Sequence, residues 1–450
     1  MTPPSLFQQE NDILEQCEPF LVTGQVTQVV GLIVEALGLR APVGALCQID
    51  TAEGPAEAEV VGFRDGRMLL IPYKPVRGLE PGARVQVLEL KQTVGVCDEM
   101  LGRVLSGSGT PIDSGPDLIP THRLPLFASA PPALSRSKIH EPLSTGIRAI
   151  DAFLTCGRGQ RLGIFAGSGV GKSVLLGMMC RHTSAPIVIV GLVGERGREV
   201  REFIERDLGD EGMARAVIVV ATADESPMER VKAAFCATTI AEYFRNQGED
   251  VLLLIDSITR IAFAQREIGL SAGEPPATRG YPPSVFNLFP QLLERSGRGA
   301  IGSITAFYTV LVEGDDIADP IADTTRSILD GHIWLSRKLS SRSHYPAIDP
   351  LESISRSMID VVDDSHLKAS RSLVQLLSQY QESEDLVSVG AYVRGTNPLL
   401  DKALELRPEI LEFLQQDRFE KSTFEDTQTW LHGLHQKTLP AQSQRPGGGS

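Results

Sequence analysis

The chain of 450 residues carries 43 basic and 57 acidic side chains, a formal net charge of -14, and is 42% hydrophobic and 22% charged. This composition is typical of a folded protein of two or three domains and excludes a disordered, collagenous or coiled-coil molecule. The acidic balance argues against a uniformly basic nucleic-acid-binding protein.

The sequence also limits where the protein works. No apolar run reaches the roughly 18 residues of a membrane span, and the first twenty residues contain acidic but no basic side chains, so no signal peptide is predicted. The six cysteines form no CxxC motif and are interpreted as reduced thiols. We expect a cytoplasmic protein without a transmembrane segment, or one that is peripheral to a membrane at most.

The N-terminal part predicts an arm followed by a β domain. Residues 1–20 are weakly amphipathic and form either a frayed terminus or an oligomerisation arm. Residues 21–92 contain several short strands with no helix between them, which is typical of a small antiparallel β-barrel. Asp65-Gly66, between apolar strands, indicates a hairpin.

The pattern changes over residues 93–365. A linker-like, proline-rich stretch leads to Pro132, and strands then alternate with helices. Nearly continuous apolar strands indicate a mainly parallel sheet covered by helices on both faces. The expected strands are 162–166, 187–193, 217–221, 251–255, 301–307 and 333–335, and the expected helices include 172–181 and 229–247.

The C-terminal part has a helical period. Apolar residues such as Leu373, Leu376 and Leu377 recur at helical spacing, so residues 366–436 are expected to form a small α-helical domain. Residues 437–450 are expected to be a disordered tail. The predicted fold class is therefore a multi-domain chain: an N-terminal β-barrel, a central α/β core with a mainly parallel sheet, and a C-terminal helical domain.

A phosphate-binding loop is predicted at residues 166–173. It follows an expected strand and opens an expected helix, which is the context this motif requires. Its sequence is Ala166-Gly167-Ser168-Gly169-Val170-Gly171-Lys172-Ser173. Backbone amides of such a turn bind phosphate oxygens, Lys172 adds a charge, and the Ser173 hydroxyl is placed for Mg²⁺. Ala166 replaces the usual first glycine, and a chance glycine-rich turn is the alternative. ATP and Mg²⁺ are the expected cofactors.

A second carboxylate element is expected to face this loop. The apolar strand 251–255 ends at Asp256, and ligands of open α/β sheets bind at the carboxyl ends of the strands. Asp256 is predicted to hold Mg²⁺, through water. The signal is weak by itself, because apolar strands often end in Asp, and it gains specificity from the phosphate-binding loop in the same sheet.

A candidate catalytic carboxylate follows another strand. Glu195 comes directly after the strand 187–193, within a charged segment that includes Arg196. A carboxylate at this edge can polarise the water that attacks the γ-phosphorus. The alternative is a solvated charged loop. Glu195, Arg196 and Lys172 are the candidate catalytic residues within this part of the chain.

Several longer stretches resemble a known family. Residues 345–356 resemble the signature of the rotary ATPase α/β family, and here they are Tyr345-Pro346-Ala347-Ile348-Asp349-Pro350-Leu351-Glu352-Ser353-Ile354-Ser355-Arg356. The nearest match within it is the ATPase of type III protein export, flagellar or injectisome. Further stretches that carry the resemblance are 157–161, 194–203, 264–269, 273–281, 309–316 and 389–395. The resemblance covers roughly residues 22–420, and neither the arm nor the tail takes part.

The resemblance implies a fold, an activity and partners. It implies a RecA-like P-loop core in a homohexameric ring that hydrolyses ATP at the cytoplasmic base of an export apparatus. The implied partners are a stator-like regulator, a coiled-coil central stalk, export chaperones with their cargo, and the membrane export gate. Details of the runs 303–308 and 325–332 favour flagellar export over injectisome secretion.

The resemblance also implies roles for individual residues. Tyr345 is expected to stack on adenine, with a core tyrosine as the alternative. Arg356 is expected to act on the ATP of the neighbouring subunit, the alternative being an intrachain salt bridge to Glu352 or Asp360. Residues 269–276 are expected to form a loop rather than a helix, with Leu270 and Glu274 touching the stalk, or else a plain surface loop.

Two other functions remain open from sequence. A hexameric RNA translocase would need stacking aromatics in the β domain, where only Phe63 and Tyr73 are available in residues 21–92. An inactive nucleotide-binding ring subunit would lack the carboxylate that Glu195 supplies.

Overall fold

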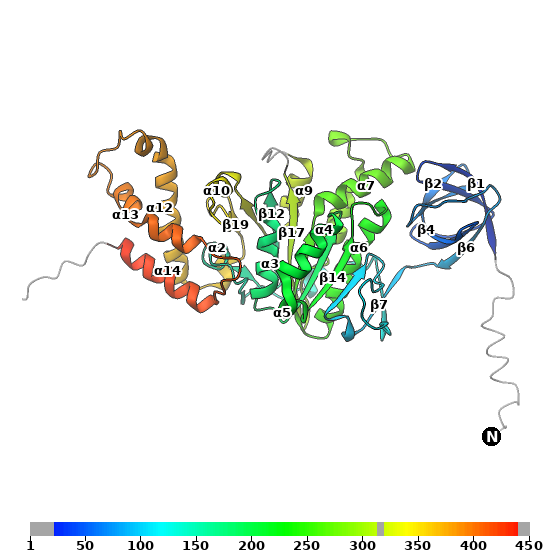
Figure 1. Ribbon diagram of the computed structural model, residues 1–450, viewed down its shortest axis with the longest axis horizontal. Coiled ribbons are helices and arrows are strands. Elements are labelled where there is room, and N and C mark those ends of the chain that lie inside the picture. The colour runs from blue at the N-terminus through cyan, green and yellow to red at the C-terminus, as the bar shows by residue number, and fades with distance from the viewer. Residues whose placement is uncertain (1–21, 313–318, 440–450) are drawn as a thin grey trace, which may run out of the picture. The chain divides into compact units, whose positions relative to one another are not determined.

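The computed structural model describes residues 22–312 and 319–439 (Figure 1). The predicted arm at residues 1–20 and the part of the predicted tail beyond residue 439 lie outside the described residues. The described chain divides into two units. One contains residues 22–92 with Glu267–Glu274, and the other contains Thr93–Arg266 with the chain from Pro275 onward. The domain boundaries expected from the sequence stay predictions.

The first unit is built on a closed six-stranded barrel. Its strand order is β1-β2-β5-β4-β3-β6, and its core includes Val26, Val34, Ile49, Val60 and Leu70. The strands are β1 (Thr23–Val30), β2 (Ile33–Leu37), β3 (Leu46–Thr51), β4 (Gly54–Arg64), β5 (Arg67–Pro72) and β6 (Arg84–Glu89). Positive φ angles at Asp65 and Gly66 close the expected hairpin between β4 and β5. The predicted barrel is confirmed.

The second unit contains the expected sheet. Its strand order is β19-β18-β12-β17-β15-β13-β14-β8; the neighbours from β18 to β8 are parallel, and β19 is antiparallel to β18. The strands are β8 (Arg103–Ser106), β12 (Arg161–Ala166), β13 (Ile187–Val193), β14 (Ala216–Ala221), β15 (Asp250–Asp256), β17 (Ser303–Leu311), β18 (Gly331–Leu335) and β19 (Ile354–Ser355). Two-residue β16 (Gly297–Arg298) pairs with β17, and β10 (Pro142–Leu143) pairs with β11 (Cys156–Gly157).

The stretch expected to be a linker is partly strand. Arg103–Ser106 pairs with β14 as an edge strand of the sheet, and β7 (Thr93–Val96) pairs with β9 (His122–Pro125). The 3₁₀ turns η1 (Asp98–Met100) and η2 (Ala133–Ser135) complete this stretch. Four-residue strands bounded by glycine and proline give too short a pattern to be recognised without their partner strands.

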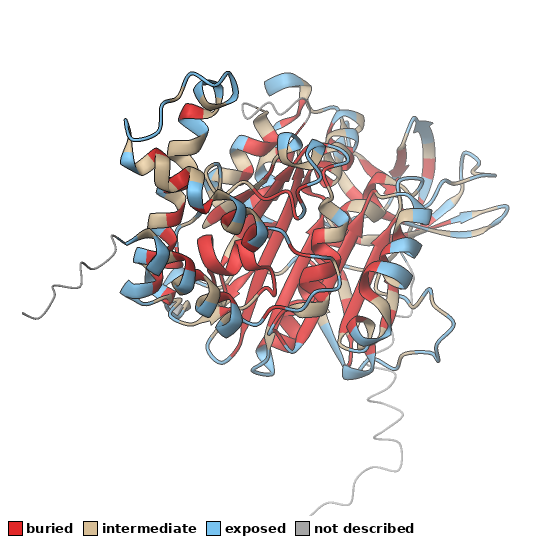
Figure 2. Ribbon diagram, turned by 60° about the vertical axis from the view of Figure 1, so that its left-hand side comes forward, coloured by how far each residue is buried: buried red, intermediate tan, exposed pale blue. Residues whose placement is uncertain are grey.

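Helices cover both faces of the sheet, as predicted, so the strands are buried (Figure 2). Helix α3 (Lys172–His182) belongs to the core on one face, and α6 (Pro227–Asn246) packs on β13, β14 and β15. The remaining helices of this core are α2 (Arg148–Phe153), α4 (Gly197–Glu202), the π-helical η3 (Phe203–Leu208), α5 (Gly209–Met213), α7 (Ile258–Ala272), η4 (Thr278–Gly280), α8 (Pro283–Leu293), α9 (Pro320–Ile328), α10 (Arg337–Ser341) and α11 (Met358–Val361).

One expectation about a loop was wrong. Residues 269–272 belong to helix α7, and the chain leaves the helix only at Gly273. The Gly273 amide donates to the Leu270 carbonyl and the Glu274 amide to the Gly269 carbonyl, while Gly273 has a φ of 93°. This is a Schellman cap, which uses glycine to end a helix. The small residues before Gly273 are compatible with a helix, so Gly273 is the residue that indicates where the helix ends.

The C-terminal helices pack on the core within the same unit. They are α12 (Asp364–Ser388), α13 (Pro398–Leu414) and α14 (Phe424–Thr438), and all three contact α2. The buried Arg148 of α2 donates to the Phe413 carbonyl and pairs with Glu420. Lys437 and Thr438, assigned to the tail from sequence, are helical. Among the described residues, no helix combines the length and apolarity needed to cross a membrane.

Candidate functional site

The predicted phosphate-binding loop lies where β12 meets α3. Ala166 ends the strand and Lys172 begins the helix. Gly169 and Gly171 have φ angles of 78° and 93°, a region that side chains rarely adopt. A Cβ on Gly169 would meet nothing within 4 Å, so its glycine serves the backbone conformation rather than close packing. The turn and the helix N-terminus therefore form an open anion-binding backbone.

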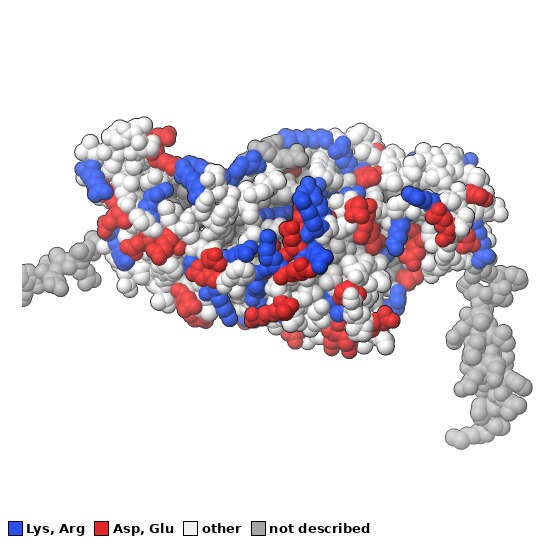
Figure 3. Space-filling view, in the orientation of Figure 1, with Lys and Arg blue, Asp and Glu red and all other residues white. Residues whose placement is uncertain are grey.

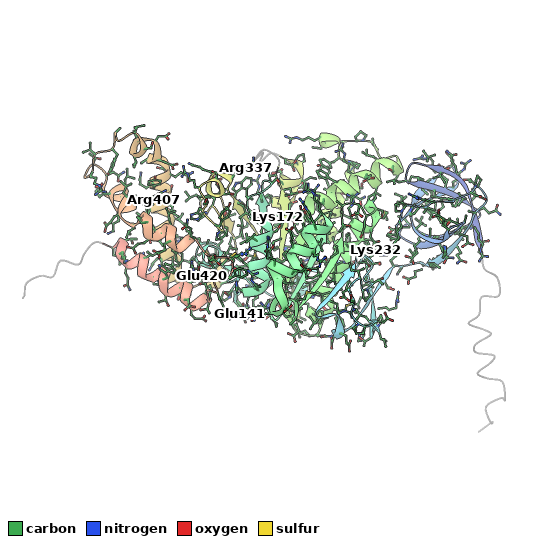
Figure 4. All side chains as sticks on the ribbon, in the orientation of Figure 1. Glu141, Lys172, Lys232, Arg337, Arg407 and Glu420 are labelled. Atoms are coloured by element: carbon green, nitrogen blue, oxygen red, sulfur yellow. The ribbon has the colours of Figure 1, made fainter. Side chains whose placement is uncertain are left out.

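Lys172 connects the three predicted elements. Its Nζ lies 2.5 Å from Asp256 Oδ1 and 3.5 Å from Glu195 Oε1. Asp256 ends β15 and Glu195 follows β13, so three parallel strands deliver these side chains to one edge of the sheet. Figure 4 labels Lys172 at the start of α3. The structure thus brings Lys172, Glu195 and Asp256 together.

Thr309 supports Asp256 from the neighbouring strand. Its Oγ1 donates to Asp256 Oδ1 at 2.6 Å, and Thr309 is fully buried on β17. Because the hydroxyl occupies the same oxygen that Lys172 contacts, the orientation of the carboxylate is fixed. Sequence reasoning missed Thr309, since one threonine in an apolar strand gives no separate signal.

The charges of this cluster shift one another's pKa values. Burial lowers the pKa of Lys172, but the attraction of Asp256 and Glu195 outweighs burial, so the net shift is upward. Burial raises the pKa of Glu195; Lys172 opposes this rise, while Asp256 and a hydrogen bond with Glu199 add to it. A carboxyl group with a raised pKa beside a lysine is the kind of group that can exchange protons with water.

The cluster opens into a cavity of about 660 Å³, a size typical of small-molecule sites. Ser173 is exposed to it. Arg196 also lines it and pairs with Glu199 at 3.2 Å. The other lining residues are Gly167, Ser168, Gly169, Gly171, Lys172, Val174, Glu195, Thr259, Arg260, Phe263, Leu311, Val312 and Arg337. Sequence reasoning did not single out Glu199, Arg260 or Arg337; Glu199 was available as the second acid of the segment after β13.

Tyr345 lies beside the same loop, at a second cavity. This cavity has about 370 Å³ and is lined by Gly169, Gly171, Val174, Leu175, Met178, Tyr345, Pro346, Gln416, Asp417 and Arg418. A Cβ on Gly171 would come within 3.5 Å of the Tyr345 ring. Tyr345 is 46% exposed, so the alternative of a core tyrosine is wrong. An aromatic face beside an apolar helix surface suits a flat heterocycle.

Arg356 lies away from both cavities. It follows β19, whose Ser355 pairs with Gly331 at the start of β18, so it belongs to the amino edge of the sheet. Its side chain is exposed. Among the described residues, Arg356 forms no ion pair, and none joins it to Glu352 or Asp360. The intrachain salt bridge is therefore not observed.

Leu270 and Glu274 lie around the end of α7, in the unit that contains the barrel. Leu270 is on the last turn and is 38% exposed, and Glu274 follows the Gly273 cap. In the barrel itself, Tyr73 is buried and its hydroxyl contacts Glu59 and Gln92. Tyr73 therefore cannot stack on a base, which leaves Phe63 as the one aromatic candidate that the RNA hypothesis named. On the face shown in Figure 3, basic and acidic side chains are interspersed.

The residues present fit a nucleotide with magnesium. The open glycine turn and Lys172 suit phosphate oxygens, and the exposed Ser173 hydroxyl and the Asp256 carboxylate are oxygen donors, which Mg²⁺ prefers. Proteins bind nucleotide-associated Mg²⁺ through one or two such groups, with water and phosphates as the other ligands. The donor set is thus sufficient.

Sequence profiles match most of the chain. Residues 146–355 match the ATP synthase alpha/beta family, nucleotide-binding domain; residues 26–88 match the beta-barrel domain of the same family; and residues 362–433 match the T3SS EscN ATPase C-terminal domain.

Individual proteins are similar over nearly the full length. A "Flagellum-specific ATP synthase" from Salmonella typhimurium is 53% identical, over 90% of this chain and 91% of that protein. A "Type 3 secretion system ATPase" from Sinorhizobium fredii is 49% identical, over 92% of each. The structure of the assembled ATPase EscN from the enteropathogenic E. coli type III secretion system is 44% identical with a TM-score of 0.87, covering 92% of this chain and 100% of that one. EscN in complex with its central stalk EscO matches with a TM-score of 0.86 at 43% identity, covering 92% of this chain and 100% of that one.

Proposed function

This chain belongs to the ATP synthase alpha/beta family, and from that membership we propose that it hydrolyses ATP to energise type III protein export, in the flagellar system. The chain is an ATPase of the flagellar and type III secretion branch, as the relatives of about 50% identity over nine-tenths of its length are. The flagellar assignment rests on the runs 303–308 and 325–332; sequence identity does not separate the two systems, since flagellum-specific relatives are 45% to 53% identical and secretion relatives 48% to 49%. Deleting the gene separates the two: flagellar function predicts loss of motility, and injectisome function predicts loss of effector secretion with motility intact.

The site residues divide the work of hydrolysis. The loop amides of residues 167–171 and Lys172 hold the phosphates, and Tyr345 stacks on adenine. Ser173 and Asp256, the latter through water, would hold Mg²⁺, which supplies charge neutralisation on the phosphate oxygens. Glu195 orients the attacking water and accepts its proton, while Arg196 lies at the cavity edge against Glu199. The raised pKa of Glu195 makes it a better proton acceptor than an ordinary glutamate.

One observation supports this function most. Lys172 lies between Asp256 and Glu195, at 2.5 and 3.5 Å, beside a cavity of about 660 Å³. A lysine that pairs with two carboxylates beside a cavity can instead form ion pairs with the phosphate oxygens of a bound nucleotide.

The test is Mg²⁺-dependent ATP hydrolysis by the purified chain and by Lys172→Ala. The variant is expected to lose nucleotide binding and turnover together, because Lys172 contacts ground-state phosphates. Lys437→Ala is a matched control, an exposed lysine on α14 that pairs with Glu409, and is expected to hydrolyse ATP normally. Equal rates for Lys172→Ala and Lys437→Ala would refute the assignment.

The proposal extends to assembly. The chain acts as a homohexamer at the inner face of the plasma membrane, and Arg356 completes the site of the neighbouring subunit. Its exposed position on the amino edge, without an ion pair in the described chain, supports this role. A ring also suits the similarity to an assembled ATPase.

The remaining partners are proposed with the ring. Leu270 and Glu274 contact the coiled-coil stalk, consistent with an exposed helix end and with the EscN–EscO complex of a similar protein. The other proposed partners are the stator-like regulator, export chaperones with cargo, and the export gate; nucleic acid is not proposed as a partner. A photo-cross-linker at position 270 should capture the stalk protein in assembled complexes, and a cross-linker at exposed Leu386 of α12 serves as the control position. Capture from position 386 but not from 270 would contradict the stalk contact.

A further inference from the structure

A third cavity lies at the other end of helix α3. It has about 580 Å³ and lies between the segments that carry Glu141 and Glu420, both labelled in Figure 4. Pro142 and Lys421, the next residues of those segments, line it. The C-terminal turn of α3 contributes Arg181 and His182. We call it the α3-end cavity.

Apart from Arg158, the cations of the α3-end cavity have no carboxylate within ion-pair distance in the described chain, and Glu211 and Asp207 attract Arg215 and Arg181 from farther away. The Arg215 guanidinium donates only to main-chain carbonyls, including those of Cys180 and Arg181 at 2.9 and 2.8 Å. Arg181 likewise donates to the carbonyls of Asp207 and Arg418. Among the described residues, no carboxylate forms an ion pair with Arg181, Arg215, His182 or Lys421. Carbonyl dipoles satisfy the N–H groups but leave the net charge.

The acidic side chains around the cavity are few. Glu211 and Glu425 line it, and Arg158, also at its wall, is paired with Asp250 at 2.5 Å. Glu420 is engaged by Arg148. Counting Arg158 as neutralised and His182 as neutral, three cations face two acids. The hydroxyls of Thr183, Ser184 and Thr423 also line the cavity, and they donate to the Ser144 carbonyl and to Asp426.

The pKa of His182 also reflects the nearby cations. Burial lowers the pKa of His182, and the charges of Arg181, Lys421 and Arg215 lower it further. The N-terminus of α14, a 15-residue helix, also opens at the cavity through Thr423, Phe424 and Glu425, and the capping box of Thr423 with Asp426 offsets its positive dipole end. The arrangement repels cations and has room for an anion larger than water.

We propose that the α3-end cavity binds a small phosphate-bearing anion, distinct from the nucleotide of the P-loop. Lys421 provides a mobile ammonium to it and Arg215 a fixed positive charge, since Lys421 is exposed and has no ion pair in the described chain. The Lys421 ammonium can donate charged hydrogen bonds to phosphate oxygens, and the half-buried arginines add positive charge behind it.

The bound anion would act on the adenine cavity through one segment. Arg418, whose carbonyl accepts from Arg181, lines the cavity of Tyr345, and the Gln416 amide donates to the Tyr345 carbonyl at 2.9 Å. An anion that fixes Lys421 would order residues 416–421, so the Michaelis constant for ATP should fall. This consequence rests on the proposed function, whereas binding itself does not.

The experiment measures binding of pyrophosphate by calorimetry. The protein is the full chain carrying Lys172→Ala, without metal, so that the P-loop contributes little and no hydrolysis is needed. Adding Lys421→Glu should abolish binding, and adding Lys421→Ala should weaken it about tenfold, the order expected for one charged hydrogen bond. Lys421 is exposed, so neither change threatens folding.

Lys368→Ala in the same background is the matched control, an exposed lysine of α12 with no ion pair in the described chain. It should bind pyrophosphate like its parent. Loss of binding confined to the Lys421 variants supports the site. No binding by the Lys172→Ala parent, or equal affinity with Lys421→Glu, overturns it. Because the assay is free of nucleotide, a failure here is distinguishable from a failure of the ATPase assignment.

Discussion

The two edges of the central sheet use charged residues differently. At the amino edge, Arg103 pairs with Asp113 at 2.6 Å and Arg161 with Asp330 at 3.1 Å, and these pairs hold the starts of strands. At the carboxyl edge, Lys172 pairs with Asp256 and Glu195 beside a large cavity. The first kind of pair lies away from the cavities described above, whereas the second lies beside one of them, where Lys172 can exchange a carboxylate for a phosphate.

Arg356 differs from the other charged residues of the amino edge. It lies on the amino edge but has neither a carboxylate partner in the described chain nor burial. A permanently charged side chain held at the surface is available to a second molecule. Arg356 at the amino edge of one subunit would then supply a positive charge to the phosphates bound at the carboxyl edge of the next subunit.

The largest expected effect comes from Arg356→Ala. Turnover should fall by roughly 10³–10⁵, the usual contribution of an arginine that stabilises the transferring phosphoryl group. Nucleotide affinity should change little, because the chain's own P-loop is intact. Steady-state kinetics with a fluorescent-nucleotide titration measures both quantities.

Mixing the Arg356→Ala and Lys172→Ala variants tests whether the two edges of the sheet act together across a subunit boundary. In mixed rings an intact P-loop can adjoin an intact arginine, so part of the activity should return. A strictly sequential ring would also prevent this rescue, so the oligomeric state and the concentration dependence of wild-type activity are measured alongside. Full specific activity from a demonstrated monomer would exclude action in trans.

Glu195→Gln should lower turnover by roughly 10²–10⁴ while ATP still binds, because only the attacking water needs the carboxylate. The raised pKa of Glu195 adds a pH signature. The base must be deprotonated, so wild-type activity should decline on acidification at a pH above the ordinary glutamate pKa of about 4.3. Wild-type turnover by Glu195→Gln would show that ATP hydrolysis does not require the Glu195 carboxylate.

Tyr345→Ser should raise the Michaelis constant about tenfold and change turnover less, since stacking on a base is worth about 1–3 kcal/mol. Tyr345→Phe is the matched control. It keeps the ring and removes only the hydroxyl, which contacts Ser340 at 3.1 Å. If the two variants had equal Michaelis constants, the ring would not contact adenine.

The smallest expected effect concerns the ion pairs of the amino edge. Hydrogen bonds from Arg103 lower the pKa of Asp113 to about 2, so its contribution is present above the unfolded pKa near 3.9 and is lost as the pH falls toward 2. Asp113→Asn should lower the melting temperature by roughly 2–4 °C at neutral pH, and the difference should vanish near pH 2. Turnover should stay unchanged. A large loss of turnover would contradict the view that the ion pairs of the amino edge only stabilise the fold.

The fold was largely predictable because its signals are local. The apolar strand 251–255 and the turn at Asp65-Gly66 can each be recognised without a partner. Arg103–Ser106 could not be, since its strand character comes from pairing with β14. The sequence places the end of α7 too early, because Gly269, Ser271 and Ala272 are small residues that a helix tolerates as well as a loop does, and the Gly273 cap depends on carbonyls one turn earlier.

The site was predictable where a motif spans consecutive residues. Lys172 and Ser173 are marked by the glycine loop, and Glu195 by its place after a strand. Thr309 and Arg260 reach the cluster from other elements, and their relevance depends on distances that the sequence does not contain. The α3-end cavity likewise joins residues 142–144, 181–184, 211–215 and 421–425, which only the folded chain brings together.

The contact between Lys172 and Asp256 has a consequence for the order of arrival at the site. A divalent cation that comes alone meets an ammonium group already 2.5 Å from the carboxylate assigned to it, and the two positive charges repel. A phosphate chain can draw Lys172 aside, whereas a bare ion cannot. Mg²⁺ would therefore bind Asp256 weakly until phosphate oxygens attract Lys172 away from the carboxylate.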